Sequence, residues 1–212
     1  MHAAAADAVV FDLGGVLIDW NPRHLYRKLF EDEAKMERFL SEVCSPVWNV
    51  TLDAGMSFDE GIAELLRRHP DEAHLIRAWK ERWEEMLGGA IEGAVALLDE
   101  LHAAGMPLYA LTNWSAETFP IGRRHFPFLE RFRDIVVSGQ EKIVKPDPRI
   151  FELLVRRTGV APERTVFIDD AERNVAAAAR LGFRAVRFTD PESLRASLTA
   201  LGALAPGAAA RP

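Results

Sequence analysis

The chain has 212 residues, 49% of them hydrophobic, and carries a formal net charge of −6. This length accommodates one domain with an insertion or two small domains, and no stretch is long and apolar enough to span a bilayer. The acidic balance argues against nucleic acid as a general partner, but not against a small anionic substrate beside a metal ion. A single cysteine, Cys44, excludes an internal disulfide and makes a structural zinc site unexpected. It suits a reducing cytoplasm, where we expect the protein because its start shows no secretory signal pattern.

The first predicted strand is the apolar run 8–11, which ends in Asp12 and is followed by Gly14 and Gly15. A carboxylate in this place lies at the carboxyl edge of a sheet, where open α/β sheets bind their ligands. The glycines let the backbone turn sharply and approach a ligand closely. Asp12 is therefore a candidate site residue, although an aspartate that only forms a turn gives the same local pattern.

The next segment, from Leu17 to about Ala90, has a helical pattern and contains no convincing strand. Asn21 is a predicted N-cap that is followed by a proline at the first helical position. Residues 57–60 form a capping-box signature. A further helix is predicted over residues 72–87, where apolar side chains recur at helical spacing.

The rest of the chain alternates predicted strands and helices. An apolar stripe that begins at Ala94 predicts a helix closed by Gly105. Later strands are predicted near residues 107–112, 134–138, 164–169 and 184–188, and later helices near residues 148–158, 171–181 and 191–201. This alternation implies a parallel sheet with right-handed crossovers. Residues 203–212 are rich in alanine, proline and glycine, and we expect them to form a disordered tail.

Polar side chains also follow two of the later strands. One run ends in Thr112 and Asn113, and another ends in the carboxylate pair Asp169 and Asp170. Two carboxylate sites on neighbouring strand ends are able to hold Mg²⁺, because that ion prefers a few carboxylates together with water and substrate phosphate. Lys145 precedes a predicted helix. Together with Thr112 it is able to hold the oxygens of a transferring phosphoryl group. Each residue also has a structural interpretation, since aspartates cap helices and most lysines are solvated.

Along the chain these residues form four motifs: Asp12, then Thr112 and Asn113, then Lys145, then Asp169 and Asp170. In this order the motifs resemble those of the haloacid dehalogenase-like hydrolase superfamily, and the resemblance extends from about Asp7 to Phe188. The resemblance implies an α/β fold with a Rossmann-like parallel sheet core, formed by residues 1–17 and 91–212. An all-helical cap domain is inserted over residues 18–90, as in one subgroup of that family.

The resemblance also implies a role for each motif residue. Asp12 is expected to be the nucleophile that takes up the phosphoryl group as an aspartyl phosphate. Mg²⁺ is expected between the carboxylates of Asp12, Asp169 and Asp170 and the backbone carbonyl of Gly14. Which aspartate of the pair binds it directly stays open.

The two remaining motifs are expected to hold the phosphoryl group. Lys145 would bind both the nucleophile and the phosphoryl oxygens. Thr112 would donate a hydrogen bond through its hydroxyl, and Asn113 would donate one through its backbone N–H.

Gly14 departs from the pattern of the family's phosphatases. They usually carry a second aspartate two residues after the nucleophile, which protonates the leaving group and later activates water. Such a general acid/base is worth about 10²–10⁴-fold in rate. A cap residue, water, or a leaving group that needs little protonation would fill the gap; otherwise the protein turns over slowly or not at all.

The predicted function is Mg²⁺-dependent hydrolysis of a small phosphate ester by a monomer or homodimer, in a branch that resembles sugar-phosphate phosphatases. Two alternatives stay open: a metal-independent 2-haloacid dehalogenase that uses the same Asp12, and a binding protein with little turnover. The dehalogenase branch lacks the acidic pair and carries an arginine early in the cap. Between Phe30 and Met56 this chain has only Arg38, so the phosphatase is favoured.

Five residues are candidates for contacting the rest of the substrate: Trp20, His24, Trp48, Asn49 and Trp114. A structural interpretation is as good for the tryptophans, because tryptophans at helical spacing are more often core residues. His24 equally fits a surface or hinge histidine.

Overall fold

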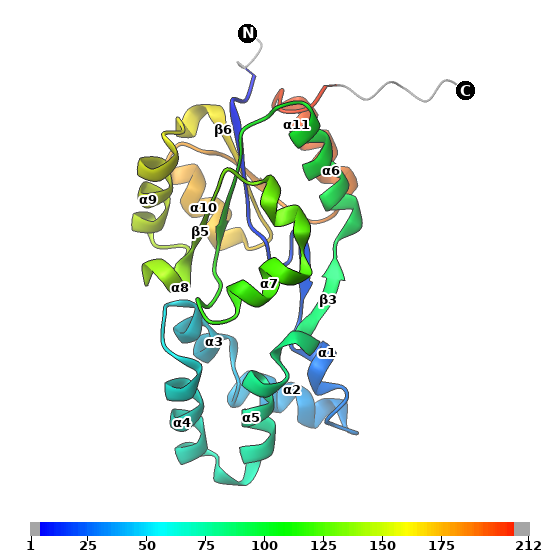
Figure 1. Ribbon diagram of the computed structural model, residues 1–212, viewed down its shortest axis with the longest axis vertical. Helices are drawn as coiled ribbons and strands as arrows, with labels where there is room; N and C mark the ends of the chain where they lie inside the picture. The colour runs from blue at the N-terminus through cyan, green and yellow to red at the C-terminus, as the bar shows by residue number, and fades with distance from the viewer. Residues whose placement is uncertain (1–4, 206–212) are drawn as a thin grey trace, which may run out of the picture.

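The computed structural model describes residues 5–205 and contains a central sheet of five strands. The strands are β1 (Ala8–Phe11), β4 (Leu108–Thr112), β5 (Asp134–Val137), β6 (Thr165–Asp169) and β7 (Arg184–Arg187). They pair in the order β5-β4-β1-β6-β7, and every pairing is parallel. The predicted α/β fold with a parallel sheet core is therefore confirmed (Figure 1).

Helices cover both faces of this sheet. They are α6 (Glu92–Ala103), α9 (Pro148–Thr158), α10 (Glu172–Arg180) and α11 (Pro191–Ala200). Because side chains alternate along a strand, Val9 of β1 enters the apolar core beneath α6 and α11, and Val10 enters the core beneath α9 and α10. The later strands, and α9, α10 and α11, begin and end within one residue of the bounds that the apolar runs and start signals predict.

The helices between β2 (Ile18–Trp20) and β3 (Leu87–Ala90) gather at the end of the molecule opposite the two termini (Figure 1). They are α1 (Arg23–Tyr26), α2 (Glu33–Glu42), α3 (Pro46–Asp53), α4 (Phe58–Arg68) and α5 (Ala73–Glu81). Side chains fix three of their starts: Asp32 caps α2, Ser45 caps α3, and Ser57 with Glu60 forms the capping box of α4. We call these five helices the cap.

The interior of the cap is aromatic. The ring centroids of Tyr26 and Phe39 lie 5.1 Å apart and those of Trp48 and Trp79 lie 5.2 Å apart, and all four side chains are buried. The same apolar cluster continues into the face of the sheet beneath α6 and α11. The cap is therefore packed onto the sheet by buried apolar surface and not only tethered to it.

The prediction of a strand-free segment between Leu17 and Ala90 is wrong. Two strands, β2 (Ile18–Trp20) and β3 (Leu87–Ala90), pair antiparallel where the chain enters and leaves the cap. In Figure 1 β3 runs between the cap and the sheet. No local pattern marked this ribbon, because its strands are short, come from opposite ends of the segment, and include two glycines, which are unfavourable in strands.

The helix predicted over residues 72–87 is also interrupted. It ends with α5 at Glu81, and a 3-10 turn covers Trp83–Met86. Arg82 leaves helical geometry there. Trp83 packs against Trp114 beyond β4, with ring centroids 5.8 Å apart, so contact with the core replaces continuation of the helix.

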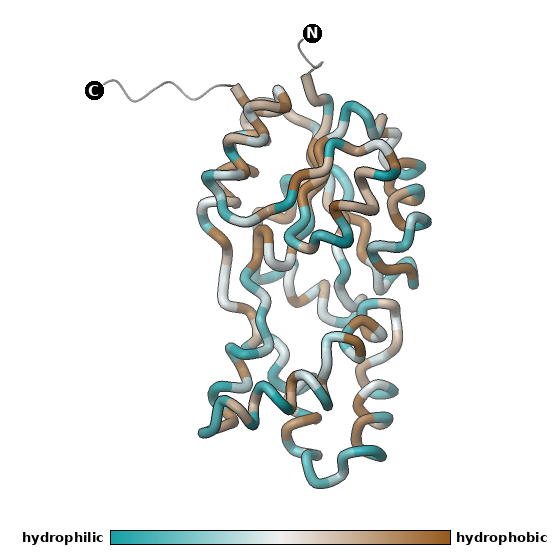
Figure 2. The backbone as a smooth tube through the Cα atoms, turned by 180° about the vertical axis from the view of Figure 1, so that it is seen from behind, coloured by the Kyte–Doolittle hydropathy of each residue, from teal (hydrophilic) through white to brown (hydrophobic). Residues whose placement is uncertain are grey.

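Two short helices, α7 (Phe119–His125) and α8 (Ser138–Glu141), follow β4 and β5 beside the cap (Figure 1). The backbone is coloured by hydropathy in Figure 2, where apolar residues concentrate along the strands of the sheet and hydrophilic ones along the outer turns of the cap. No helix in residues 5–205 is long and apolar enough to cross a membrane. Of the tail expected over residues 203–212, Ala203 and Leu204 are buried in the core, and residues 206–212 lie outside the described residues.

Candidate active site

Three carboxylates meet at the carboxyl edge of the sheet. Asp12 follows β1, Asp169 ends β6, and Asp170 comes next. Because β1 and β6 are parallel neighbours, their carboxyl ends coincide. One oxygen from each of the three side chains lies within 4.8 Å of the others. Such a set of oxygen donors suits a hard divalent cation such as Mg²⁺.

Lys145 places its ammonium group between two of these carboxylates. Its Nζ lies 2.9 Å from Asp12 Oδ2 and 2.7 Å from Asp169 Oδ2, and it donates a third hydrogen bond to the carbonyl of Leu111 at 2.8 Å. The lysine side chain is fully buried, a position that is tolerated only with charged partners. Burial opposes its charge, but Asp12 and Asp169 outweigh burial and hold the pKa of Lys145 above its usual value.

Asp12 is also buried, and burial raises its pKa. Lys145 opposes this rise, whereas the negative charges of Asp169 and Asp170 add to it. The carboxylate accepts a hydrogen bond from the backbone of Leu13 at 2.7 Å, which fixes its orientation. A cation at this cluster would favour the ionised form of Asp12, which is the nucleophilic one.

Asp169 and Asp170 have different surroundings. Asp169 is fully buried and accepts hydrogen bonds from the backbone of Ala171 at 2.9 Å and from Asn174 Nδ2 at 3.0 and 3.1 Å, besides its contact with Lys145. Asp170 is exposed and lines the cavity in front of the sheet edge. The protein therefore holds Asp169 in place and leaves Asp170 accessible to a ligand.

The two glycines after Asp12 differ in what they require. Gly15 has a φ of +74°, and a Cβ there would lie 2.6 Å from Asp170 Oδ2, so only glycine fits beside this carboxylate. Gly14 has no positive φ, and a Cβ there would meet nothing within 4 Å. The backbone conformation and the neighbouring atoms therefore leave room for a side chain at position 14.

The end of β4 and the loop of Lys145 are tied together. The side chain of Asn113 accepts a hydrogen bond from the Lys145 backbone N–H at 2.8 Å and donates one to the Lys145 carbonyl at 3.0 Å. Thr112 is buried at the last position of β4, the strand beside β1. The structure thus brings Asp12, Lys145, Asp169 and Asp170 together and places Thr112 and Asn113 at the end of the strand beside β1. It also gives the Asn113 side chain a positioning role that sequence analysis missed.

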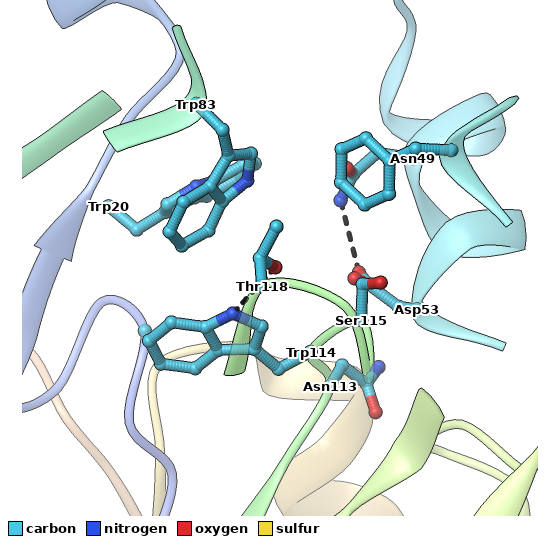
Figure 3. A pocket seen from close by; sticks show the side chains of 10 residues that line it. Trp20, Asn49, Asp53, Trp83, Asn113, Trp114, Ser115 and Thr118 are labelled. Carbon is cyan, nitrogen blue, oxygen red and sulfur yellow. Dashed lines mark hydrogen bonds between the residues drawn. The ribbon is translucent and has the colours of Figure 1, made fainter. Parts of the chain in front are cut away.

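Two adjoining cavities open between the sheet edge and the cap. The larger, of about 490 Å³, reaches Asp12 and Asp170. The smaller, of about 60 Å³, has indole and phenyl rings in its walls, and we call it the tryptophan pocket (Figure 3). Its rings belong to Trp20, Phe58, Trp83 and Trp114. The two cavities adjoin, because five residues line both: Gly14, Trp20, Asn49, Asp53 and Asn113.

The predicted substrate contacts divide into two groups. Trp20, Asn49 and Trp114 line the tryptophan pocket. Trp48 lies in the cap interior instead, where its indole N–H donates to the carbonyl of Gly61 at 3.2 Å.

His24 is likewise absent from the walls of both cavities. Its Nε2 lies 2.9 Å from Asp19 Oδ2, beside the β2–β3 ribbon. The structure therefore places His24 at the ribbon and Trp48 in the cap interior, because each has a partner there.

Sequence analysis missed Asp53 and Trp83, which also line the tryptophan pocket. Asp53 is the last residue of α3. An acidic residue in the last turn of a helix opposes the helix dipole, and this local conflict was the available signal. Trp83 carried no such signal, because its position depends on the break at the end of α5.

The parallel sheet thus carries a buried aspartate paired with a lysine, and a cluster of three carboxylates, at its carboxyl edge. The model of the haloacid dehalogenase-like hydrolase family matches residues 6–182, and the chain belongs to this family.

Relatives in this family include phosphatases and dehalogenases. The chain is 26% identical to the sesquiterpene phosphatase astK of Aspergillus oryzae over 86% of this chain and 90% of that protein. It is 27% identical to (S)-2-haloacid dehalogenase 4A of Burkholderia cepacia over 89% of this chain and 77% of that protein. A 36% identical match to acyl-CoA dehydrogenase family member 10 of Mus musculus covers 49% of this chain but only 10% of that much longer protein.

Solved structures of the family have the same fold. A HAD-like family hydrolase from Porphyromonas gingivalis superposes with a TM-score of 0.70 at 26% identity, covering 91% of this chain and 98% of that one. A HAD family enzyme from Bacteroides thetaiotaomicron, solved as a magnesium complex, has a TM-score of 0.66 at 22% identity and covers 88% of this chain and 94% of that one.

Proposed function

We propose that this protein is a cytoplasmic, Mg²⁺-dependent phosphatase that hydrolyses a small phosphate ester through an aspartyl phosphate on Asp12. The observation that carries the proposal is the cluster of Asp12, Asp169 and Asp170 at the sheet edge. Three ionised carboxylates carry more negative charge than the single positive charge of Lys145 neutralises. Oxygen donors at this spacing suit Mg²⁺.

The donors differ in how they would serve the metal. Asp12 and Asp170 line the larger cavity, and Gly14 lines it too, so its carbonyl is a further candidate ligand. Asp169 would support the site from behind, since protein donors already hold its oxygens. When bound, Mg²⁺ would neutralise charge on the phosphoryl oxygens.

The chain's own residues account for the chemistry at phosphorus. Asp12 attacks phosphorus in line, and the bond from phosphorus to the leaving oxygen breaks. Lys145 orients Asp12 and stabilises the charge that develops on the phosphoryl oxygens, with hydrogen bonds from Thr112 and the Asn113 backbone. Water then attacks the phosphorus of the aspartyl phosphate, releasing inorganic phosphate and restoring Asp12.

The tryptophan pocket supports an apolar or aromatic leaving group. It begins beside Gly14 and Asn113, where the substrate leaves the phosphoryl site, and its walls present Trp20, Trp83 and Trp114. Apolar walls with a few polar groups favour ligands that bury apolar surface. The relative astK, whose name refers to a sesquiterpene phosphatase, supports the same substrate class.

The dehalogenase alternative has less support from this site. That chemistry needs no metal, so it leaves the acidic cluster unexplained. Arg38, which sequence analysis considered as a binding residue for the halide, lines a separate cavity with Glu42 and Arg68.

A metal-dependence assay tests the proposal. We expect hydrolysis of p-nitrophenyl phosphate and naphthyl phosphate with Mg²⁺, complete loss with EDTA, and recovery on renewed addition of Mg²⁺. Hexose 6-phosphates should have lower kcat/KM values than naphthyl phosphate, and Trp20→Ala should narrow this difference. Release of halide from 2-haloacids in EDTA, without phosphatase activity, would instead select the dehalogenase.

A further inference from the structure

A phosphatase that lacks a side chain at Gly14 still needs a proton for its leaving group. The walls of the two cavities contain few described groups that are able to supply one. Asp12 is the nucleophile, and Asp170 is a proposed metal ligand. Cys44 lines the larger cavity, but burial raises its pKa far above neutrality. The remaining carboxyl on these walls is that of Asp53, which lines both cavities.

Asp53 is held at the junction of cap and sheet. Its carboxylate accepts a hydrogen bond from Asn49 Nδ2 at 3.0 Å and a second from the backbone of Ser115. Its carbonyl accepts a hydrogen bond from Ser138 Oγ at 2.6 Å, which ties the end of α3 to the start of α8. In Figure 3 the carboxylate lies between Asn49 of the cap and Ser115 and Asn113 of the loop beyond β4.

The surroundings of Asp53 also adjust its acidity. Burial raises the pKa of this carboxyl to about 7, although the Ser115 backbone and the positive charge of Lys145 oppose the rise. A group that titrates near the working pH is present in both protonation states. It is therefore suited to give a proton in one step and take one in the next.

We propose that Asp53 is the general acid/base of this enzyme, contributed by the cap in place of the side chain that is missing at Gly14. This inference rests on the proposed phosphatase function. As Asp12 attacks, the protonated carboxyl of Asp53 gives its proton to the leaving oxygen, and the product departs as an alcohol. The Asp53 carboxylate then takes a proton from the water that attacks the aspartyl phosphate, which returns Asp53 to its protonated form.

The test compares wild type with Asp53→Asn, loaded with Mg²⁺, on phosphate esters of graded leaving-group pKa. For alkyl phosphates, kcat/KM should fall by about 10²–10⁴-fold, because the leaving oxygen departs without its proton. For p-nitrophenyl phosphate, kcat/KM should change little, since this leaving group needs no proton. Its kcat should nevertheless fall, with a burst of p-nitrophenolate, because hydrolysis of the aspartyl phosphate has lost its base.

Two further variants sharpen the comparison. Asp71→Asn removes an exposed carboxylate of the cap and should behave as wild type. Gly14→Asp in the Asp53→Asn background should restore much of the alkyl phosphatase activity, because position 14 has room for the side chain. An unchanged dependence on leaving group in Asp53→Asn would overturn the role of Asp53 and leave the phosphatase function standing. A wild type that hydrolyses no ester with Mg²⁺ would overturn both.

A second measurement does not depend on the folding of any variant. In wild-type protein labelled with ¹³C at the aspartate carboxyl carbons, the signal of Asp53 should titrate near pH 7, far above an ordinary aspartate at about 3.9. Comparison with Asp53→Asn or Asp53→Glu assigns the signal. A pKa below about 5 would rule out Asp53 as the acid.

Discussion

At the residue scale, the lack of a side chain at Gly15 leaves space for the Asp170 carboxylate, a proposed metal ligand. Gly15→Ala places a Cβ against the Asp170 carboxylate and strains a backbone with positive φ. We expect a loss of about 1–3 kcal/mol in the free energy of unfolding and a weaker apparent affinity for Mg²⁺. Urea denaturation and the Mg²⁺ dependence of activity measure the two effects.

Gly14→Ala is the matched control for stability, because its Cβ meets nothing and its φ is ordinary. It should unfold at the same urea concentration as wild type or a higher one. Equal loss of stability in the two variants would show that the backbone needs glycine at both positions, and the absence of a side chain at Gly14 would then have a structural cause.

The raised pKa of Asp53 also has a consequence for stability. A carboxyl whose pKa is higher in the folded state stabilises the fold below its unfolded pKa, and this contribution is lost as pH rises through about 7. Asp53→Asn stays neutral throughout. The free energy of unfolding of Asp53→Asn, relative to that of wild type, should therefore increase by about 1–2 kcal/mol from pH 5 to pH 8. This is less than the whole pKa shift would give, because Asp53 is partly solvated.

Urea unfolding in EDTA at the two pH values measures this gain. The difference between the proteins isolates Asp53, because the other titrating groups, Asp12 among them, are present in both. A stability difference that is the same at pH 5 and pH 8 would mean that the carboxyl is ionised normally.

At the element scale, the starts of the cap helices are set by local chemistry. In the capping box of α4, the Ser57 hydroxyl accepts from the backbone of Glu60, and the Glu60 carboxylate accepts from the backbone of Ser57. Ser57→Ala should cost about 0.5–2 kcal/mol of stability. Ser41→Ala, which alters an exposed serine within α2, is the comparison and should cost less. Thermal unfolding monitored by circular dichroism distinguishes the two.

The elements that could be predicted are those whose position follows from the pattern of residues within the segment itself. β1, β4 and β6 are apolar runs buried on both faces, and the polar side chains at their ends indicate the site from the sequence alone. Parallel strands share one carboxyl edge, and Asp12 and Asp169 meet there because β1 and β6 are also neighbours in the sheet.

What escaped prediction depends on contacts between distant segments. The β2–β3 ribbon forms only because the two ends of the cap segment meet. The tryptophan pocket joins Trp20, Trp83 and Trp114, whose positions depend on that ribbon, on the break after α5 and on the end of β4. Asp53 likewise acquires its place over the sheet edge from the packing of α3 against α8, which no spacing in the sequence encodes.

At the scale of the whole molecule, the proposed reaction uses both parts of the chain. The sheet edge supplies Asp12, Lys145 and the acidic cluster. The cap supplies Asn49 and Asp53 and covers the approach to the sheet. Because one buried apolar cluster joins the cap to the sheet, their packing fixes the position of the cavity walls relative to each other.

The most direct test of the phosphatase function is to find the phosphoryl group on the enzyme. Protein mixed with Mg²⁺ and p-nitrophenyl phosphate is quenched in acid and analysed by mass spectrometry, with Asp12→Asn as the control. We expect a mass increase of one phosphoryl group, localised to Asp12, and neither this adduct nor turnover in a folded Asp12→Asn. Turnover that persists in Asp12→Asn, or a phosphoryl group on another residue, would contradict the proposed function.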